Sequence, residues 1–311
     1  MLHVLNGDAT ATVFAGAGIS GERLVWRDIV VEGPVPVHAH TPLPERFAYL
    51  AERLDIDGAA YARAIEAQTA RLAATSRDDE VVLWFEQDLF CAVTLWSLLD
   101  WLTRHVPAAR LSLVYPACGA QVRGLGAMEP AQLATLFAAR QPVTDVARAL
   151  GVEAWAAYAN RHPATAASFI DRPTPALPFV AGAFRCHLGR FPSVANGLNE
   201  VESAALDALS RGRCSFDELF REVGAQPRVR RHGMGDLQLA ACLRRLTPLV
   251  STERDGLEIT ARGRAVVAGD EDWLGLQPID TWLGGVHLCP DRPLWRWDGI
   301  VGRLVGPSQG V

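Results

Sequence analysis

Charged and polar side chains follow three short apolar runs in the N-terminal part of the sequence. Carboxylates in such positions can act as general acids or bases, or can hold a hard cation such as magnesium. An arginine beside them can bind a phosphate or carboxylate group through two parallel hydrogen bonds. We therefore predict catalytic roles for Asp8, Glu86 and Asp88, and ligand-binding roles for Asn6, Arg27, Asp28 and Glu32.

A simpler interpretation competes with this one for two of the acids. Asp8 and Asp88 each stand just before an expected helix, and aspartate is a preferred N-cap residue. Capping explains each residue singly, but it explains three acidic strand ends together less well. The ligand that we expect is a small phosphorylated or carboxylated molecule. The metal is unknown, with a divalent cation such as magnesium as a candidate.

These side chains need a sheet that brings the ends of their strands together. Strands are expected at 2–5, 23–26, 81–85 and 111–115, and helices at 9–17, 43–75 and 89–105. Short, wholly apolar strands that alternate with helices predict a mostly parallel sheet covered on both faces. In such sheets ligands bind beyond the carboxyl ends of the strands. Residues 1–120 are therefore predicted to form a Rossmann-like α/β domain.

One motif in this domain is misleading. Residues 16–21 read G-x-G-x-x-G, the spacing of a dinucleotide-binding loop. That loop requires a strand before it and a helix after it. Here the expected order is reversed, so the segment is predicted to be a helix end and a turn.

The second half of the chain is expected to be helical over 121–195 and then to form a small separate unit over 196–270. In that unit Asn199 is placed as an N-cap with Glu202 as its partner. Three helices are followed by a hairpin around Asp255-Gly256, which suggests a winged helix-turn-helix. The remaining segment, 271–311, is rich in tryptophan and could close over another domain, or could bring His287 and Asp298 to a ligand site.

Charge does not favour DNA binding by this unit. Residues 200–270 hold 11 arginines and 11 acids, although Arg228, Arg230, Arg231, Arg244 and Arg245 form a local basic group. A DNA-reading domain is expected to present an electropositive face. Winged helices also serve as packing modules, and a fold alone does not define a function.

All 30 basic residues of the chain are arginine, and this excludes several enzyme classes. Without lysine there is no Schiff-base enzyme and no standard Walker A site. The net charge of −5, the absence of a long apolar run and six widely spaced cysteines are typical of a cytoplasmic protein without a membrane span. No signal peptide is expected at the N-terminus.

Taken together, the motifs resemble those of the bacterial family known as domain of unknown function 1835. The resemblance rests on His3 to Asp8, Val25 to Asp28, Glu32 to Pro36, Val82 to Leu89, Phe191 to Ser193, Gly233 to Asp236, Asp280 to His287 and Trp295 to Asp298. It covers nearly the whole chain and implies no particular activity. The family has histidine at the places of Val31 and Gln87, and a polar pair near Cys91 and Ala92. This chain therefore lacks the histidines that the family would offer to a metal or to proton transfer.

Two functions remain open at this point. The first is a small-ligand binder or enzyme that uses the strand-end residues of the α/β domain. The second is a regulator or interaction module in which the α/β domain senses a ligand and the winged-helix-like unit contacts DNA or a protein.

Overall fold

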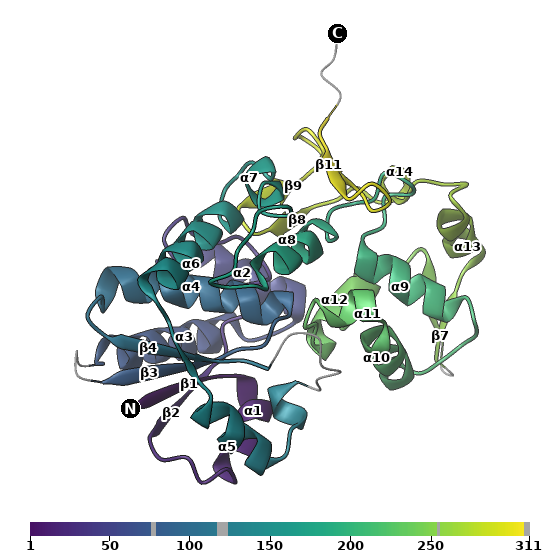
Figure 1. Ribbon diagram of the computed structural model, residues 1–311. Helices are drawn as coiled ribbons and strands as arrows, with labels where there is room; N and C mark the ends of the chain where they lie inside the picture. Colours follow the sequence, from purple (N-terminus) through teal and green to yellow (C-terminus); the bar gives the residue numbers. More distant parts are fainter. Residues whose placement is uncertain (76–78, 117–123, 254–255, 308–311) are drawn as a thin grey trace.

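The computed structural model describes residues 1–75, 79–116, 124–253 and 256–307 (Figure 1). Its largest sheet has the order β2-β1-β3-β4-β5. The strands are β1 (Leu2–Asn6), β2 (Glu22–Trp26), β3 (Glu80–Trp84), β4 (Arg110–Val114) and β5 (Gln141–Pro142). The first four are parallel, and β5 runs antiparallel to β4. The predicted mostly parallel α/β sheet is confirmed.

Helices cover both faces of this sheet (Figure 1). One face carries α1 (Gly7–Ala15), η1 (Leu125–Ala127) and α5 (Pro130–Ala138), and the other carries α4 (Leu89–His105) and α6 (Asp145–Tyr158). Side chains alternate between the faces along each strand. Val82 and Trp84 therefore pack in the core between the sheet and α1, and Val81 and Leu83 pack in the core between the sheet and α4.

The order of strands makes β1 and β3 neighbours whose next strands, β2 and β4, lie toward opposite edges of the sheet. The chain leaves β1 through α1 on one face and leaves β3 through α4 on the other. This is the topological switch point at which open α/β sheets bind ligands. Asn6 is the last residue of β1, and the residues that follow the two strands include Asp8, Glu86 and Asp88.

Two further helices lie on the β2 side of the sheet. α3 (Gly58–Ala73) packs near β2, and α2 (Pro44–Leu54) packs on α3. The sequence predicted one helical stretch over 43–75. The break between the helices is at Asp55, whose φ of 57° is left-handed and ends α2. The G-x-G-x-x-G segment lies between the end of α1 and the start of β2, as predicted.

The helical region adds α7 (Ala164–Ala167) and α8 (Val180–Leu188) to the α4 side. Trp96 of α4 stacks on Phe184 of α8, with ring centroids 4.7 Å apart. The same core continues into the C-terminal hairpins β8 (Thr281–Leu283) with β9 (Val286–Leu288), and β10 (Arg296–Asp298) with β11 (Arg303–Val305). The helical region and the tail thus share their hydrophobic core with the α/β domain.

A second core belongs to residues 196–276, which we call the C-terminal unit. It contains α9 (Glu200–Leu209), α10 (Phe216–Ala225), α11 (Pro227–Arg230), α12 (Asp236–Arg245), β6 (Val250–Glu253), β7 (Gly256–Ile259), α13 (Ala261–Ala268) and α14 (Trp273–Leu276). Leu206, Leu219, Leu239 and Trp273 meet in its interior. Asn199 caps α9 with Glu202 as its reciprocal partner, as predicted. β6 and β7 form the expected antiparallel hairpin, whose turn residue Asp255 lies outside the described residues. Cys118, one of the six cysteines, also lies outside them.

The tail hairpins contact the rest of the chain through glycines and aromatic rings. Gly285 donates to the carbonyl of Tyr158 at the end of α6 (3.0 Å). Trp282 stacks on His287, which lies 2.6 Å from Asp280. Asp298 accepts hydrogen bonds from the next backbone amides, at Ile300 and Val301. These contacts favour the closing role of the tail over a direct role for His287 and Asp298 in a ligand site.

No helix in the described part of the chain is both long enough and apolar enough to cross a membrane.

Two helical glycines give a matched test of the α4–α6 packing. A Cβ atom on Gly151 of α6 would lie 2.3 Å from Leu99 Cδ1, whereas one on Gly182 of α8 would meet nothing within 4 Å. We expect Gly182→Ala to stabilise the protein by roughly 0.5–1 kcal/mol, since alanine is the better helix former. Gly151→Ala should lose about 1–3 kcal/mol through overpacking. Urea unfolding of both variants measures the difference, and a gain from Gly151→Ala would contradict this packing.

Candidate functional site

The seven predicted site residues lie near the carboxyl edge of the sheet, but they belong to four separate sets of contacts. Asp8 pairs with Arg27, and Asn6 lies with Glu86 and Asp88 beside Cys91. Asp28 and Glu32 each have their own arginine. In the described residues no hydrogen bond or ion pair joins Glu86 to the Asp8–Arg27 pair.

The Asp8–Arg27 pair lies on the surface. Arg27 donates from Nε to Asp8 Oδ2 (3.0 Å) and from Nη2 to Asp8 Oδ1 (2.5 Å). The hydrogen bond from Arg27 lowers the pKa of the Asp8 carboxyl. Asp8 is the second residue of α1, whose N-cap position is Asn6, so it is not the predicted helix cap. Its side chain is 71% exposed and is bound to the arginine. Because the charge of Asp8 already offsets that of Arg27, the pair as a whole attracts an anionic ligand only weakly.

The strand-end carboxylates of Glu86 and Asp88 lie in a less polar environment. Asp88 is the N-cap of α4 and accepts from the amide of Cys91 (2.8 Å), as the capping interpretation predicted. Burial raises the pKa of Asp88. Burial and the nearby Asp88 charge raise the pKa of Glu86 to about 7, although the amide of Leu125 donates to it at 2.8 Å. A carboxyl that titrates near neutrality can act as a general acid or base.

The thiol of Cys91 completes this group. Asn6 donates from Nδ2 to Cys91 Sγ at 2.8 Å. Burial, followed by the charges of Asp88 and Glu86, raises the pKa of Cys91, so the thiol is a poor nucleophile. No set of three or more His, Cys, Asp and Glu side chains in the described residues is placed to hold a metal ion.

The C-terminal unit covers the start of α4. The amides of Leu89 and Phe90 donate to the carbonyls of Arg231 (2.8 Å) and His232 (3.3 Å). Gly233 adopts a φ of 63°, and a Cβ atom there would lie 2.3 Å from Asp88 Oδ1. Free amides at a helix N-terminus are the usual anion-binding groups of open α/β sheets. Here two of them are occupied by the protein's own backbone.

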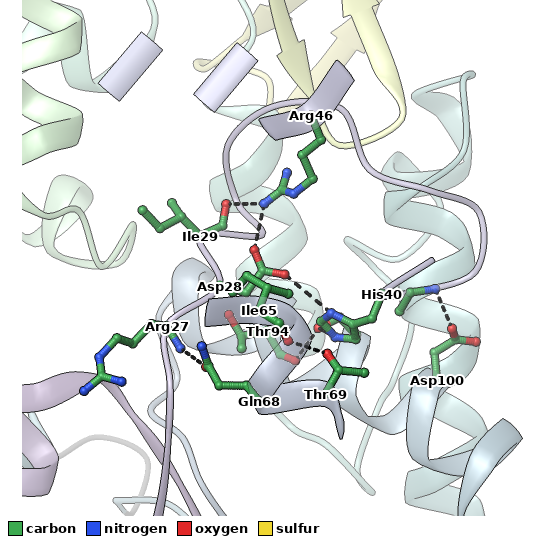
Figure 2. Close-up of polar contacts among 12 residues, drawn as sticks. Arg27, Asp28, Ile29, His40, Arg46, Ile65, Gln68, Thr69, Thr94 and Asp100 are labelled. Atoms are coloured by element: carbon green, nitrogen blue, oxygen red, sulfur yellow. Dashed lines mark hydrogen bonds and ion pairs between the residues drawn. The ribbon is translucent and has the colours of Figure 1, made fainter. Parts of the chain in front are cut away.

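Asp28 is the centre of a buried polar network. It accepts from Arg46 Nη2 (3.0 Å) and Tyr61 Oη (2.7 Å), and His40 Nδ1 lies 3.4 Å from its other oxygen. Figure 2 shows the Asp28 carboxylate between Arg46 and His40, with the Arg27 guanidinium pointing away. Burial acts to raise the pKa of Asp28, but the charge of Arg46 and the contacts of His40 and Tyr61 outweigh it and hold the pKa below its usual range.

The network continues from His40 into α4. His40 Nε2 lies 3.2 Å from Ser97 Oγ, and the Ser97 hydroxyl donates to the carbonyl of Thr94 (2.7 Å). The next residue back, Ala39, donates to Asp100 Oδ2 (2.9 Å) (Figure 2). His40 has a φ of 57°, an uncommon conformation for this residue type. These bonds hold the loop 27–43 against α4.

Glu32 joins three parts of the chain. It accepts from Arg190, which follows α8, at 2.8 Å and from Gln238 of α12 at 3.0 Å. Arg46 also donates to its backbone carbonyl. Sequence reasoning missed these partners, together with His40 and Tyr61. The expected helical pattern carried Arg46 and Tyr61, but nothing in their spacing marked them as partners of a residue in the preceding loop.

A cavity of about 250 Å³ opens beside the Asp28 network. Its walls come from the loop 27–43, from α2, α3 and α6. They include Asp28, Val35, His40, Arg46, Ala70 and Trp155. We call this cavity the loop pocket.

The two positions at which the chain lacks the histidines of the resembled family have different surroundings. Val31 is buried and lines a second cavity, between the α/β domain and the C-terminal unit. Gln87 donates to the carbonyl of Pro116 (2.6 Å). A histidine at 31 would face that second cavity.

No model of a known protein family matches the chain, and no curated protein matches its sequence significantly. The resemblance to the domain of unknown function 1835 stays a prediction.

Two aspartates with arginine partners give a matched test of burial. Asp28→Asn leaves Arg46 buried without its counter-charge, and we expect a loss of about 3–5 kcal/mol of unfolding free energy. Asp8→Asn breaks an exposed pair and should cost no more than about 1 kcal/mol. Chemical denaturation at neutral pH measures both values. Equal losses of unfolding free energy in the two variants would contradict the stabilising role of the network around Asp28.

The raised pKa of Glu86 predicts a stability difference that depends on pH. The group has a pKa of about 7 when folded and near 4.5 when unfolded, so the native state binds more protons between these values. Wild-type stability should therefore fall relative to Glu86→Gln as the pH rises from about 4.5 to 7. At about 1.4 kcal/mol per pKa unit, the limit is about 3 kcal/mol. Chemical denaturation at several pH values between about 4.5 and 7 measures this difference in unfolding free energy. Glu52→Gln, at an exposed position, is the control, and its unfolding free energy should change with pH as that of wild type does. A constant offset between Glu86→Gln and wild type would contradict the prediction.

Proposed function

We propose that the protein binds a small, mostly apolar organic molecule in the loop pocket of its α/β domain. The observation that carries this proposal is the cavity of about 250 Å³ with three buried polar side chains, Asp28, His40 and Arg46, among apolar walls. Ligand pockets in proteins combine these same features. The proposal keeps the predicted role of Asp28 at a small-ligand site and moves the centre of that site from the strand ends to the loop 27–43. It replaces the expected phosphorylated or carboxylated ligand with an uncharged one.

The buried charged groups of the pocket, Asp28 and Arg46, are already compensated within the protein. Arg46 donates to Asp28 and to the carbonyls of Ile29 (2.8 Å) and Pro34 (3.1 Å). Both ring nitrogens of His40 face protein groups, Asp28 and Ser97. Among the described residues that line the pocket, the exposed Glu66 of α3 is the remaining charged group. The buried groups Asp28 and Arg46 are compensated by the protein, and this supports an uncharged ligand held by apolar contacts. The unusual backbone conformation of His40 is also typical of functional sites.

Catalytic roles for Asp8, Glu86 and Asp88 remain predictions beside this proposal. Asp8 is bound to Arg27 on the surface, and Glu86 and Asp88 are covered by Leu125 and Gly233. The near-neutral pKa of Glu86 is the feature that favours acid–base chemistry there.

We also propose that the C-terminal unit is winged-helix-like and serves as a packing module. The three helices α9, α10 and α12 with the hairpin β6–β7 support that fold. Its third helix, α12, packs on α2, where Ala241 contacts Leu50 and Leu54. Arg244 donates to the carbonyl of Arg53 (2.6 Å), and Arg245 is paired with Glu202. A helix engaged in this way is not free to read a DNA groove, so DNA binding is disfavoured.

The loop pocket can be closed without touching its polar network. Ala70 lines the mouth on α3, and a tryptophan there should block entry. Ala67 is an exposed alanine of the same helix outside the pocket lining, so Ala67→Trp is the matched control.

We expect a thermal-shift screen of uncharged aromatic and aliphatic fragments to give compounds that raise the Tm of wild type. These compounds should lose their effect on Ala70→Trp and keep it on Ala67→Trp. Fragments that stabilise both variants equally, or a screen in which no fragment stabilises wild type, would count against the proposal.

A further inference from the structure

A second cavity lies where the α/β domain, α8, the C-terminal unit and the hairpin β8–β9 meet. It has a volume of about 70 Å³ and is lined by Glu32, Arg53, Arg190, Glu202, Gln238 and Arg245, among others. We call it the junction cavity. A single buried water needs roughly 10–15 Å³, so this space holds more than one water. Unlike the loop pocket, the junction cavity is lined by three guanidinium groups.

Two of these guanidinium groups present buried N–H donors without a partner. Arg53 Nε and Arg245 Nη2 are shielded from solvent and have no hydrogen-bond partner among the described residues. Buried polar groups in folded proteins nearly always have a partner, in the protein or in a bound molecule. Both arginines line the junction cavity, so an acceptor bound there would give these donors a partner after a small shift of either side chain.

The charges around the cavity favour an anion over water. Arg190 is paired with Glu32, and Arg245 donates from Nη1 to Glu202. Arg53 has no ion-pair partner within the part of the chain that the structure describes, so one positive charge is left over. Water can accept from an N–H group, but it cannot offset that charge. A carboxylate or phosphate group can do both, because guanidinium matches its oxygens.

We propose that the junction cavity binds a small oxyanion, as a free phosphate or a short carboxylate. Arg53 belongs to α2 of the α/β domain and Arg245 to α12 of the C-terminal unit. An anion between them would connect the two units directly, beside the existing contact of Arg244 with the carbonyl of Arg53. This site is independent of the loop pocket and has a different ligand chemistry.

Binding of inorganic phosphate and of acetate tests the proposal on the full chain. Each is compared with chloride at the same ionic strength, by thermal shift and by titration calorimetry. We expect phosphate or acetate to raise the Tm of wild type by several degrees more than chloride does, because a ligand of the native state stabilises it. A response to phosphate alone assigns a phosphate site, and a response to acetate alone assigns a carboxylate site.

Variants then locate the binding. Arg53→Gln should weaken the affinity at least tenfold, and Arg53→Lys should keep part of it because the charge remains. Arg230→Gln, at an exposed arginine outside the cavity, should bind as wild type does, and so should Ala70→Trp, which closes only the loop pocket. Equal responses to phosphate, acetate and chloride in wild type, or unchanged affinity in Arg53→Gln, would overturn the proposal.

Discussion

A carboxylate removed from water must be compensated by the protein, and this requirement organises the carboxyl edge of the sheet. Four carboxylates there are buried or partly buried, and each is compensated differently. The partners are Arg46 for Asp28, Arg190 and Gln238 for Glu32, the Cys91 amide for Asp88, and the Leu125 amide for Glu86. These partners come from α2, the segment after α8, α12, the start of α4 and η1. The partners of the carboxylates at this one edge of the sheet therefore come from elements spread over most of the chain.

The sheet could be predicted because its information is local. Short apolar runs such as Val81 to Trp84 have no polar face to expose, so they indicate strands covered on both sides. The helix 89–105 was predicted with its observed bounds for the same kind of reason. What the sequence did not reveal was β5, a two-residue edge strand at Gln141–Pro142 with too little pattern to detect. The break at Asp55 was also missed, because a left-handed residue other than glycine or asparagine leaves little trace in composition.

The candidate site was predictable in position and not in connectivity. Parallel strands place Asn6, Asp28 and Glu86 at or just after strand ends on one edge of the sheet, but they do not determine where each side chain points. That choice depends on distant partners such as Arg190, which follows Glu32 by 158 positions. Capping was the right interpretation for Asp88 and the wrong one for Asp8, since α1 begins one residue before Asp8 and its N-cap position is Asn6. Pairing across long sequence separations is the information that residue spacing does not contain.

The cover that the C-terminal unit places over α4 also bears on how the protein is made. During synthesis the N-terminal part of the chain leaves the ribosome first, before the tail hairpins that complete its hydrophobic core. The groups that cover this edge are synthesised long after β4. They are the side chains of Arg190 and Gln238 and the carbonyls of Arg231 and His232. Until they arrive, the amides of α4 and the carboxylate of Glu32 must be solvated by water. Docking of the C-terminal unit is therefore a late folding event, and the nascent α/β domain is most exposed to misfolding and proteolysis before it occurs.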